Sequence, residues 1–197
     1  MNYLGHLYLS GNNPQLMLAN LFGDFVKGRD YSHLPLFIKE GVSLHRSIDD
    51  FTDTHPIVTE LRLELYQELP KIAGIAIDLY FDHLLADNWH HFHPKPLHEY
   101  VDDFFNAATL EIANVYEKEG FKFPDRFIHL ITIMNEQNWI KRYKNMEGLT
   151  MASTGLSKRI SFPNNLGEAS EVFLQYQNDI KSTFELFMND AQIRFNI

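Results

Sequence analysis

The sequence predicts an all-α protein that forms a single domain over residues 1–197. Apolar residues recur at three- and four-residue spacing in most segments, which is the period of an amphipathic helix. No two alternating segments flank a tight Gly- or Asn-containing turn, so no β-hairpin is indicated. Hydrophobic residues make up 45% of the chain and include 16 Phe and 9 Tyr. We therefore expect one multi-helix bundle around an aromatic core.

Proline and glycine divide the chain into its expected helices. A short apolar segment at 4–9 comes first, and Asn13 with Pro14 then provides a cap and a first helical residue. The helix that starts there should end near Gly28, and residues 89–94 should form a connection. The remaining helices are expected at 35–55, 56–69, 72–88, 97–119, 124–135, 139–143, 146–160 and 167–193.

The segment 72–88 is apolar on almost every side and is therefore expected to be a central, buried helix. A strand at 75–81 is the alternative, but the apolar run exceeds the usual strand length. Asp82 lies in this segment with His83 beside it. A buried, ionised carboxylate is costly without a partner, so a metal, a cation or hydrogen-bond donors must compensate for it.

The stretch from Gly41 to His55 is dense in groups that bind metals or phosphates. His45 and Asp49 are four residues apart, so a helix places them on one stripe, and Arg46 lies on the adjacent stripe. Such a face can hold a divalent cation next to a phosphate. It can equally be a solvated face with an ion pair.

Several further polar groups occur in apolar, helical surroundings. Mixed imidazole and carboxylate ligands suit Mn²⁺, Fe²⁺, Zn²⁺ or Mg²⁺, which promote phosphoester hydrolysis. For Asp82 the structural alternative is a hydrogen-bonded carboxylate at a helix N-terminus, and for His6 or His83 it is a core histidine. The candidates are His6, Asp24, His45, Asp49, Asp78, Asp82 and His83. We interpret His90, His91 and His93 as surface residues of a Pro-flanked connection.

Composition narrows the possible partners and compartment. The net charge of -9 argues against a broad nucleic-acid interface. Two short basic patches exist, at Lys27 with Arg29 and at Lys141, Arg142 and Lys144. The chain has no Cys, no apolar stretch long enough for a membrane span and no signal-peptide pattern at its start. We expect a cytoplasmic protein, and the sequence does not indicate its oligomeric state.

A family resemblance runs in order over nearly the whole chain. It is densest in the first 90 residues and weaker after about Met146. The matching pieces are Met1-Asn2-Tyr3-Leu4-Gly5-His6-Leu7, Asn20-Leu21-Phe22-Gly23-Asp24-Phe25-Val26-Lys27-Gly28, Gly41-Val42-Ser43-Leu44-His45-Arg46-Ser47-Ile48-Asp49, Thr52-Asp53, Pro56, Asp82-His83-Leu84 and Gln137-Asn138-Trp139-Ile140-Lys141-Arg142-Tyr143. In these pieces the sequence resembles the acyl carrier protein phosphodiesterases.

The resemblance implies an enzyme that removes the 4′-phosphopantetheine arm from holo acyl carrier protein and leaves the apo protein. It also implies a divalent cation, with Mn²⁺ favoured and Mg²⁺ or Fe²⁺ possible, and a fold similar to the HD-type phosphohydrolases. This sequence has no His-Asp dipeptide, and Asp82-His83 shows the reverse order. The usual metal ligands of the HD-type phosphohydrolases are therefore not assigned to residues of this sequence. By resemblance, the metal ligands are Asp24, His45, Asp49 and Asp82, with His6 as a weaker candidate.

The expected mechanism is hydrolysis by a metal-activated water. Asp24, Arg46 and His83 are the catalytic candidates, with Arg46 or Lys27 on the phosphate oxygens and His83 as a proton donor to the leaving serine. Carrier proteins of this kind are acidic, so docking is expected on basic groups. The substrate-binding candidates are Lys27, Arg142 and Lys144. Two alternatives stay open: a metal-dependent phosphohydrolase of small phosphoesters or nucleotides, and a non-catalytic helical binding protein.

Overall fold

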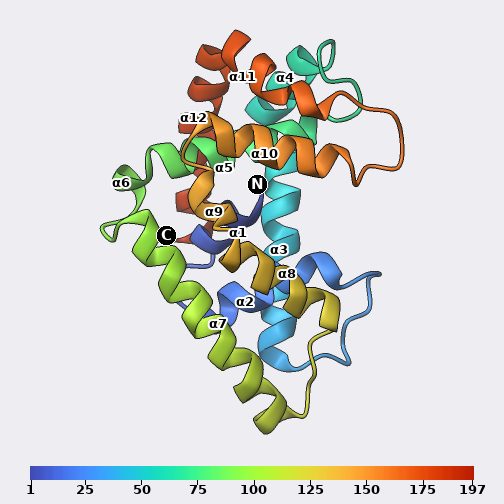
Figure 1. Ribbon diagram of the computed structural model, residues 1–197, viewed down its shortest axis with the longest axis vertical. Helices are drawn as coiled ribbons and strands as arrows, with labels where there is room; N and C mark the ends of the chain where they lie inside the picture. Colours follow the sequence, from blue (N-terminus) through green and yellow to red (C-terminus); the bar gives the residue numbers. More distant parts are fainter.

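The computed structural model describes residues 1–197, and every regular element in it is a helix (Figure 1). This confirms the predicted all-α fold class. In chain order the elements are α1 Tyr3–Tyr8, α2 Pro14–Phe22, the 3₁₀ helix η1 Gly23–Phe25, α3 Leu36–Thr54, α4 Pro56–Leu65, α5 Ala73–Asp87, α6 Trp89–Phe92, α7 Leu97–Glu119, α8 Asp125–Glu136, α9 Trp139–Arg142, α10 Met146–Ser157, the 3₁₀ helix η2 Leu166–Glu168, α11 Ala169–Gln175 and α12 Gln177–Phe195.

Local sequence signals account for several helix ends. The side chain of Asn13 caps α2 by accepting hydrogen bonds from the N–H groups of Gln15 and Leu16, at 3.1 and 3.2 Å. Pro56 is the first residue of α4. Gly120 ends α7 with a φ of 65°, in the left-handed region that glycine adopts without steric cost.

Helices α4 and α10 end at Leu65 and Ser157, before the expected ends at 69 and 160, and the structure differs from the predicted elements in three further places. The helix expected over 13–28 ends at Phe22 and continues as η1, which turns the chain toward α3. The helix expected over 167–193 is broken at Tyr176 into α11 and α12. Because α11 packs against α10 whereas α12 packs against α4 and α5, one straight helix could not cover both surfaces. The expected connection at 89–94 contains the short helix α6.

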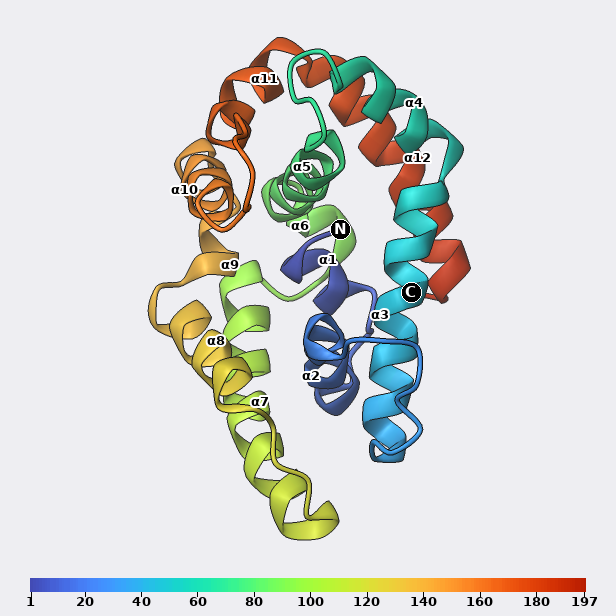
Figure 2. The ribbon, with the colours of Figure 1, turned by 90° about the vertical axis from the view of Figure 1, so that its right-hand side faces the viewer.

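Helix α5 occupies the middle of the molecule, as its apolar sequence predicts. It contacts α1, α4, α6, α10 and α12, and Figure 2 shows it between the α10–α11 arm and the α4–α12 arm. The buried apolar side chains form one contiguous cluster that runs from α1 to α12. This continuity supports our proposal that residues 1–197 form a single domain. The likeness to HD-type phosphohydrolases stays a prediction.

Helices α2 and α3 pack against each other at very short range. A Cβ atom on Gly41 would lie 2.3 Å from the Cβ of Ala19 and 2.7 Å from the backbone nitrogen of Asn20. Only glycine permits this separation, because any side chain would push the two helices apart. The crossing brings the polar residues of α3 directly against those of α2.

None of the helices combines the length and apolarity that crossing a membrane requires.

Candidate metal centre

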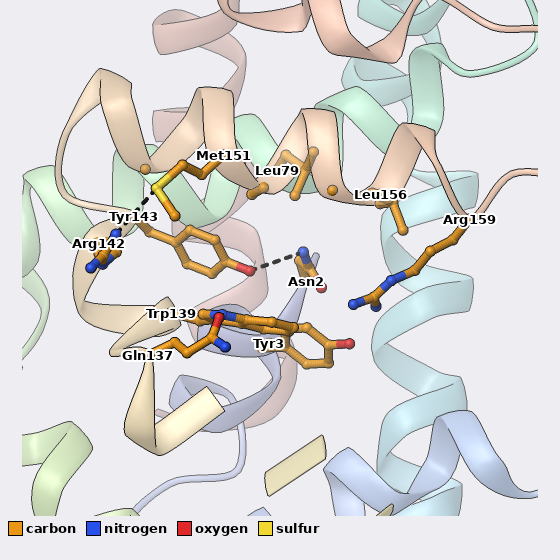
Figure 3. A pocket seen from close by; sticks show the side chains of 13 residues that line it. Asn2, Tyr3, Leu79, Gln137, Trp139, Arg142, Tyr143, Met151, Leu156 and Arg159 are labelled. Atoms are coloured by element: carbon orange, nitrogen blue, oxygen red, sulfur yellow. Dashed lines mark hydrogen bonds between the residues drawn. The ribbon is translucent and has the colours of Figure 1, made fainter. Parts of the chain in front are cut away.

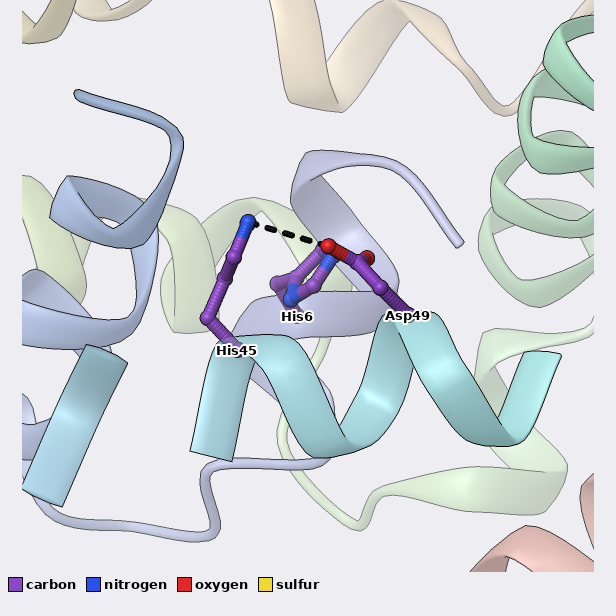
Figure 4. Close-up of side chains that lie close together, drawn as sticks. All are labelled: His6, His45 and Asp49. Carbon is purple, nitrogen blue, oxygen red and sulfur yellow. Dashed lines mark ion pairs between the residues drawn. The ribbon is translucent and has the colours of Figure 1, made fainter. Parts of the chain in front are cut away.

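The candidate metal centre lies where α1, α2 with η1, and α3 meet. His6 comes from α1, and His45 and Asp49 come from one stripe of α3 (Figure 4). Asp24 comes from η1. Nε2 of His6 lies 3.2 Å from Oδ1 of Asp49, and Nε2 of His45 lies 3.2 Å from Oδ2 of the same carboxylate. Nε2 of His45 also lies 3.4 Å from Oδ1 of Asp24. The two imidazoles therefore converge on the Asp49 carboxylate, and Asp24 adjoins this group through His45.

Asn20, a fully buried residue of α2, orients both imidazoles. Its Nδ2 group donates to the carbonyl of His6 at 3.2 Å and to Oγ of Ser10 at 2.8 Å, so both amide protons have acceptors. The orientation of the amide is fixed by these two bonds. Oδ1 consequently faces Nδ1 of His6 at 2.9 Å and Nδ1 of His45 at 3.2 Å. Each histidine must donate from Nδ1, since Oδ1 can only accept.

This arrangement leaves a lone pair on each Nε2 atom and directs both lone pairs at carboxylate oxygens. Such a contact is repulsive unless a cation or a proton lies between the atoms. Metal-binding histidines characteristically donate their second N–H to an oxygen, which sets the tautomer and the ring orientation. The ligand atoms of His6, His45 and Asp49 lie within 4.8 Å of one another, so this group could hold a metal ion.

The protonation states also suit metal binding. Burial lowers the pKa of His6, which favours the neutral imidazole. Burial is the largest single influence and raises the pKa of Asp49 and of Asp24, but the combined influence of the neighbouring His6 and His45 lowers it by more. Both carboxyl groups are therefore ionised at neutral pH, and the ligands present the lone pairs that a cation requires.

Gly23 leaves the space that His45 occupies. A Cβ atom at Gly23 would lie 2.4 Å from Cγ of the imidazole, well inside van der Waals contact. The His45 ring stacks on the ring of His6, with a centroid distance of 4.3 Å and an interplanar angle of 24°. Glycine at this position therefore allows the second imidazole to reach the first.

Asp82 does not reach the metal centre, although the sequence places it among the ligands. Its Oδ1 accepts from the N–H groups of Asn2 and Gly5 at 3.1 and 3.0 Å, and its Oδ2 accepts from the N–H of Leu4 at 2.7 Å. The side chain is completely buried. Because both oxygens are engaged by the N-terminus of α1, Asp82 positions the helix that carries His6, and we leave it out of the proposed ligand set.

Replacing Asp82 with Asn should change how stability depends on pH. Burial raises the pKa of Asp82 from 3.8 to about 7, although the three N–H donors oppose the shift. Since the folded chain holds this proton more tightly than the unfolded chain, the contribution of Asp82 is fully present below about pH 4 and is lost as the pH rises to about 7. Urea unfolding of both proteins across that range measures the effect. If the difference in the free energy of unfolding between the two proteins does not change with pH, the prediction is wrong.

Arg46 and His83, two predicted catalytic residues, make contacts outside the metal centre. Nη2 of Arg46 donates to the carbonyls of Val26 and Gly28 at 3.2 and 2.6 Å, so this guanidinium holds the loop after η1 against α3. Nδ1 of His83 lies 2.7 Å from the carbonyl of Tyr143, and burial lowers the pKa of His83. Neither side chain therefore places a hydrogen-bond donor for the phosphate, or a proton donor for the leaving group, at the metal centre.

The predicted substrate-binding residues lie in three separate places. Lys27 lines the cavity beside Asp24, whereas Arg142 lines an apolar pocket beyond α9. Lys144 lines a third cavity, together with His90 and neighbouring residues of the segment after α5. The basic patch at 141–144 is therefore divided between two cavities, and the neighbouring Lys141 pairs with Asp102.

A cavity of about 510 Å³ opens beside the metal centre at Asp24. Lys27, Arg126 and Arg159 bring three cationic groups to its walls. Burial raises the pKa of the Tyr3 hydroxyl at its edge; the Asp24 carboxylate raises this pKa further and the Arg159 guanidinium lowers it. The cavity therefore combines a carboxylate of the centre with positive charge that suits an anionic substrate.

Sequence reasoning missed Asn20, Arg126 and Arg159 as functional candidates. For Asn20 a signal existed, because a polar residue interrupts the apolar face of α2 four positions before Asp24. The two arginines carry no local signal. They come from α8 and from the segment after α10, and only the folding of these elements over α1 brings them to one cavity.

The comparisons with known proteins identify the family of the chain. Residues 1–191 match the acyl carrier protein phosphodiesterase family. Proteins named acyl carrier protein phosphodiesterase from Salmonella paratyphi A, Salmonella agona and Salmonella newport are each 31% identical over 160 residues, which is 81% of this chain and 79% of theirs. No solved structure matches the chain. Since the match spans almost the whole sequence, the chain belongs to the acyl carrier protein phosphodiesterase family, a family of hydrolases.

Proposed function

We propose that this protein hydrolyses the phosphodiester that joins 4′-phosphopantetheine to the serine of holo acyl carrier protein. The observation that carries the proposal is the pair of imidazoles that Asn20 orients toward Asp49 and Asp24, beside a cationic cavity. Family membership supplies the substrate, since the relatives are named for acyl carrier protein. The site geometry alone would suit many phosphodiesters.

We propose His6, His45, Asp49 and Asp24 as the residues that would hold the cation, with Mn²⁺ as the preferred ion. Two nitrogen and two carboxylate oxygen donors suit a first-row divalent metal better than Mg²⁺, which prefers oxygen alone. When bound, such a cation lowers the pKa of water and neutralises phosphate charge. The half-exposed side chain of Asp49 leaves one side of the centre open to substrate.

The residues of the chain then have distinct tasks. Lys27, Arg126 and Arg159 neutralise the phosphate oxygens from the cavity walls. Water adds its oxygen to phosphorus, the bond between phosphorus and the serine oxygen breaks, and one proton of that water passes to the serine oxygen. The products are apo carrier protein and the phosphate monoester of pantetheine. We assign no proton transfer to His83, because its Nδ1 lies against the Tyr143 carbonyl.

Incubating the purified protein with holo carrier protein and Mn²⁺ tests the proposal. We expect the carrier to lose the mass of the phosphopantetheinyl group, and a chelator should stop the reaction. Because both proteins are acidic, docking depends on local basic groups and should weaken as salt rises. If metal-loaded protein cleaves a small chromogenic phosphodiester but leaves the carrier intact, the carrier is not the substrate.

A further inference from the structure

An apolar pocket of about 260 Å³ lies between α9, α10 and the start of α1 (Figure 3). Trp139, Tyr143, Met151 and Leu156 provide its apolar and aromatic walls, and Leu79 of α5 contributes from behind. Its size and lining are typical of a site for part of a small ligand. None of the residues proposed for the metal centre lines this pocket, so its purpose is not metal binding.

The pocket adjoins the cationic cavity of the metal centre. Tyr3, Trp139 and Arg159 line both spaces, so each of these side chains forms part of the boundary between them. Tyr3 also lies one helical turn before His6 in α1, which connects the boundary rigidly to the metal centre. A ligand whose phosphate lies beside Asp24 can therefore extend past Tyr3 into the pocket.

Two amide side chains add hydrogen-bonding groups to the apolar walls. Asn2 donates from Nδ2 to the hydroxyl of Tyr143 at 3.3 Å, and Gln137 accepts at Oε1 from the indole of Trp139 at 2.9 Å. The other amide atoms, Oδ1 of Asn2 and Nε2 of Gln137, make no hydrogen bond within the protein. One acceptor and one donor at the pocket lining are thus available to a ligand that has its own amide groups.

The positive charge of Arg159 at the boundary indicates which end of a ligand lies there. The Arg159 guanidinium lies over the ring of Trp139, 5.6 Å from its centroid, and has no carboxylate within 4 Å. Figure 3 shows it reaching toward Tyr3 at the edge of the pocket. Arg142 lies near Met151, with Nη1 3.2 Å from the sulfur. The unpaired Arg159 suits a phosphate at the boundary, with an uncharged chain beyond it.

We infer that this pocket binds the pantetheine arm of the substrate and that Arg159 binds the phosphate to which the arm is attached. The inference rests on the proposed function for the identity of the arm. Pantetheine is a narrow chain in which apolar methyl and methylene groups alternate with two amides. The pocket matches this chemistry with aromatic and aliphatic walls and two free amide atoms, and it begins where the phosphate must lie.

Gly155 offers a way to fill the pocket without disturbing the fold. It lines the pocket from α10, and a Cβ atom there would meet nothing within 4 Å. Replacing glycine inside a helix also removes an unfavourable residue. We expect Gly155→Phe to bind free 4′-phosphopantetheine at least about tenfold more weakly than wild type, a cost of about 1.4 kcal/mol. Titration calorimetry measures this binding, and kcat/KM for holo carrier should fall in parallel.

Gly167→Phe is the matched control, because a Cβ atom at Gly167 also meets nothing within 4 Å but the residue lies outside the pocket. This variant should bind the arm like wild type. Mn²⁺ binding and turnover of a small phosphodiester should be unchanged in Gly155→Phe, which shows that its metal centre is intact.

The outcomes separate this inference from the proposed function. If wild type binds the arm and Gly155→Phe does not, the pocket assignment holds, even when wild type leaves holo carrier intact. If wild type cleaves holo carrier but Gly155→Phe binds the arm and turns over as well as wild type, the pocket assignment fails while the function stands. Absence of arm binding by wild type also overturns the assignment.

Discussion

Replacing Asp49 with Asn should lower kcat/KM for holo carrier by about 10³-fold, since metal-ion catalysis contributes several kcal/mol of transition-state stabilisation. The carboxylate of Asp49 lies within 3.2 Å of Nε2 of both His6 and His45, so it is the group most central to the site. The neutral amide keeps the size of the side chain but removes the negative charge that a cation requires. Mn²⁺ binding, measured by electron paramagnetic resonance, should be lost together with activity.

Asp50→Asn provides the control for that experiment. Asp50 is the next residue of α3, is exposed, and makes no side-chain hydrogen bond or ion pair. Asp50→Asn changes the net charge by the same amount as Asp49→Asn, so general electrostatic effects on docking are equal in the two variants. Normal Mn²⁺ binding and turnover in Asp49→Asn would show that the centre lies elsewhere, and equal losses in both variants would implicate charge alone.

Replacing Asn20 with Leu should weaken Mn²⁺ binding by about 10- to 100-fold without removing any proposed ligand. The change eliminates the acceptor that holds Nδ1 of His6 and Nδ1 of His45, so both rings lose their fixed tautomer and orientation. It also leaves buried polar groups unpaired, at about 1–3 kcal/mol each, and the melting temperature should fall. Competition with a chelating dye measures the affinity for Mn²⁺ below the melting transition.

Ser10→Ala separates orientation of the ligands from general loss of stability. Ser10 contacts the far side of the same network, where its Oγ accepts from Asn20 and donates to the carbonyl of His6 at 2.7 Å. Its removal destabilises the fold, but the bond from Nδ2 of Asn20 to the His6 carbonyl remains and keeps Oδ1 facing both imidazoles. We expect near-normal Mn²⁺ affinity in Ser10→Ala. Parallel losses of affinity in the two variants would mean that Asn20 acts only through stability.

Asp49 and Asp82 show why residue type alone does not identify a ligand. Asp49 and Asp82 both lie in predicted helices, and each neighbours a histidine in sequence or on the helix face. Asp49 meets two imidazole nitrogens, whereas Asp82 receives three backbone N–H groups from α1. A metal and a helix N-terminus both stabilise a carboxylate, so helical periodicity cannot distinguish them.

The sequence by itself determined the features that depend on neighbours along the chain. Helical periodicity predicted the all-α fold class and the buried α5, and capping residues located several helix ends. The four-residue spacing of His45 and Asp49 placed both side chains on one stripe of α3, because this geometry is local to the helix.

Only the tertiary structure decided which other groups complete the centre. The close crossing of α2 and α3 at Gly41 brings Asn20 against His45, and the capping of α1 by Asp82 positions the helix that carries His6. These contacts join residues that are 25 and 78 positions apart in the chain. Side-chain packing between helices sets their separation and rotation, and no spacing within a single helix contains that information.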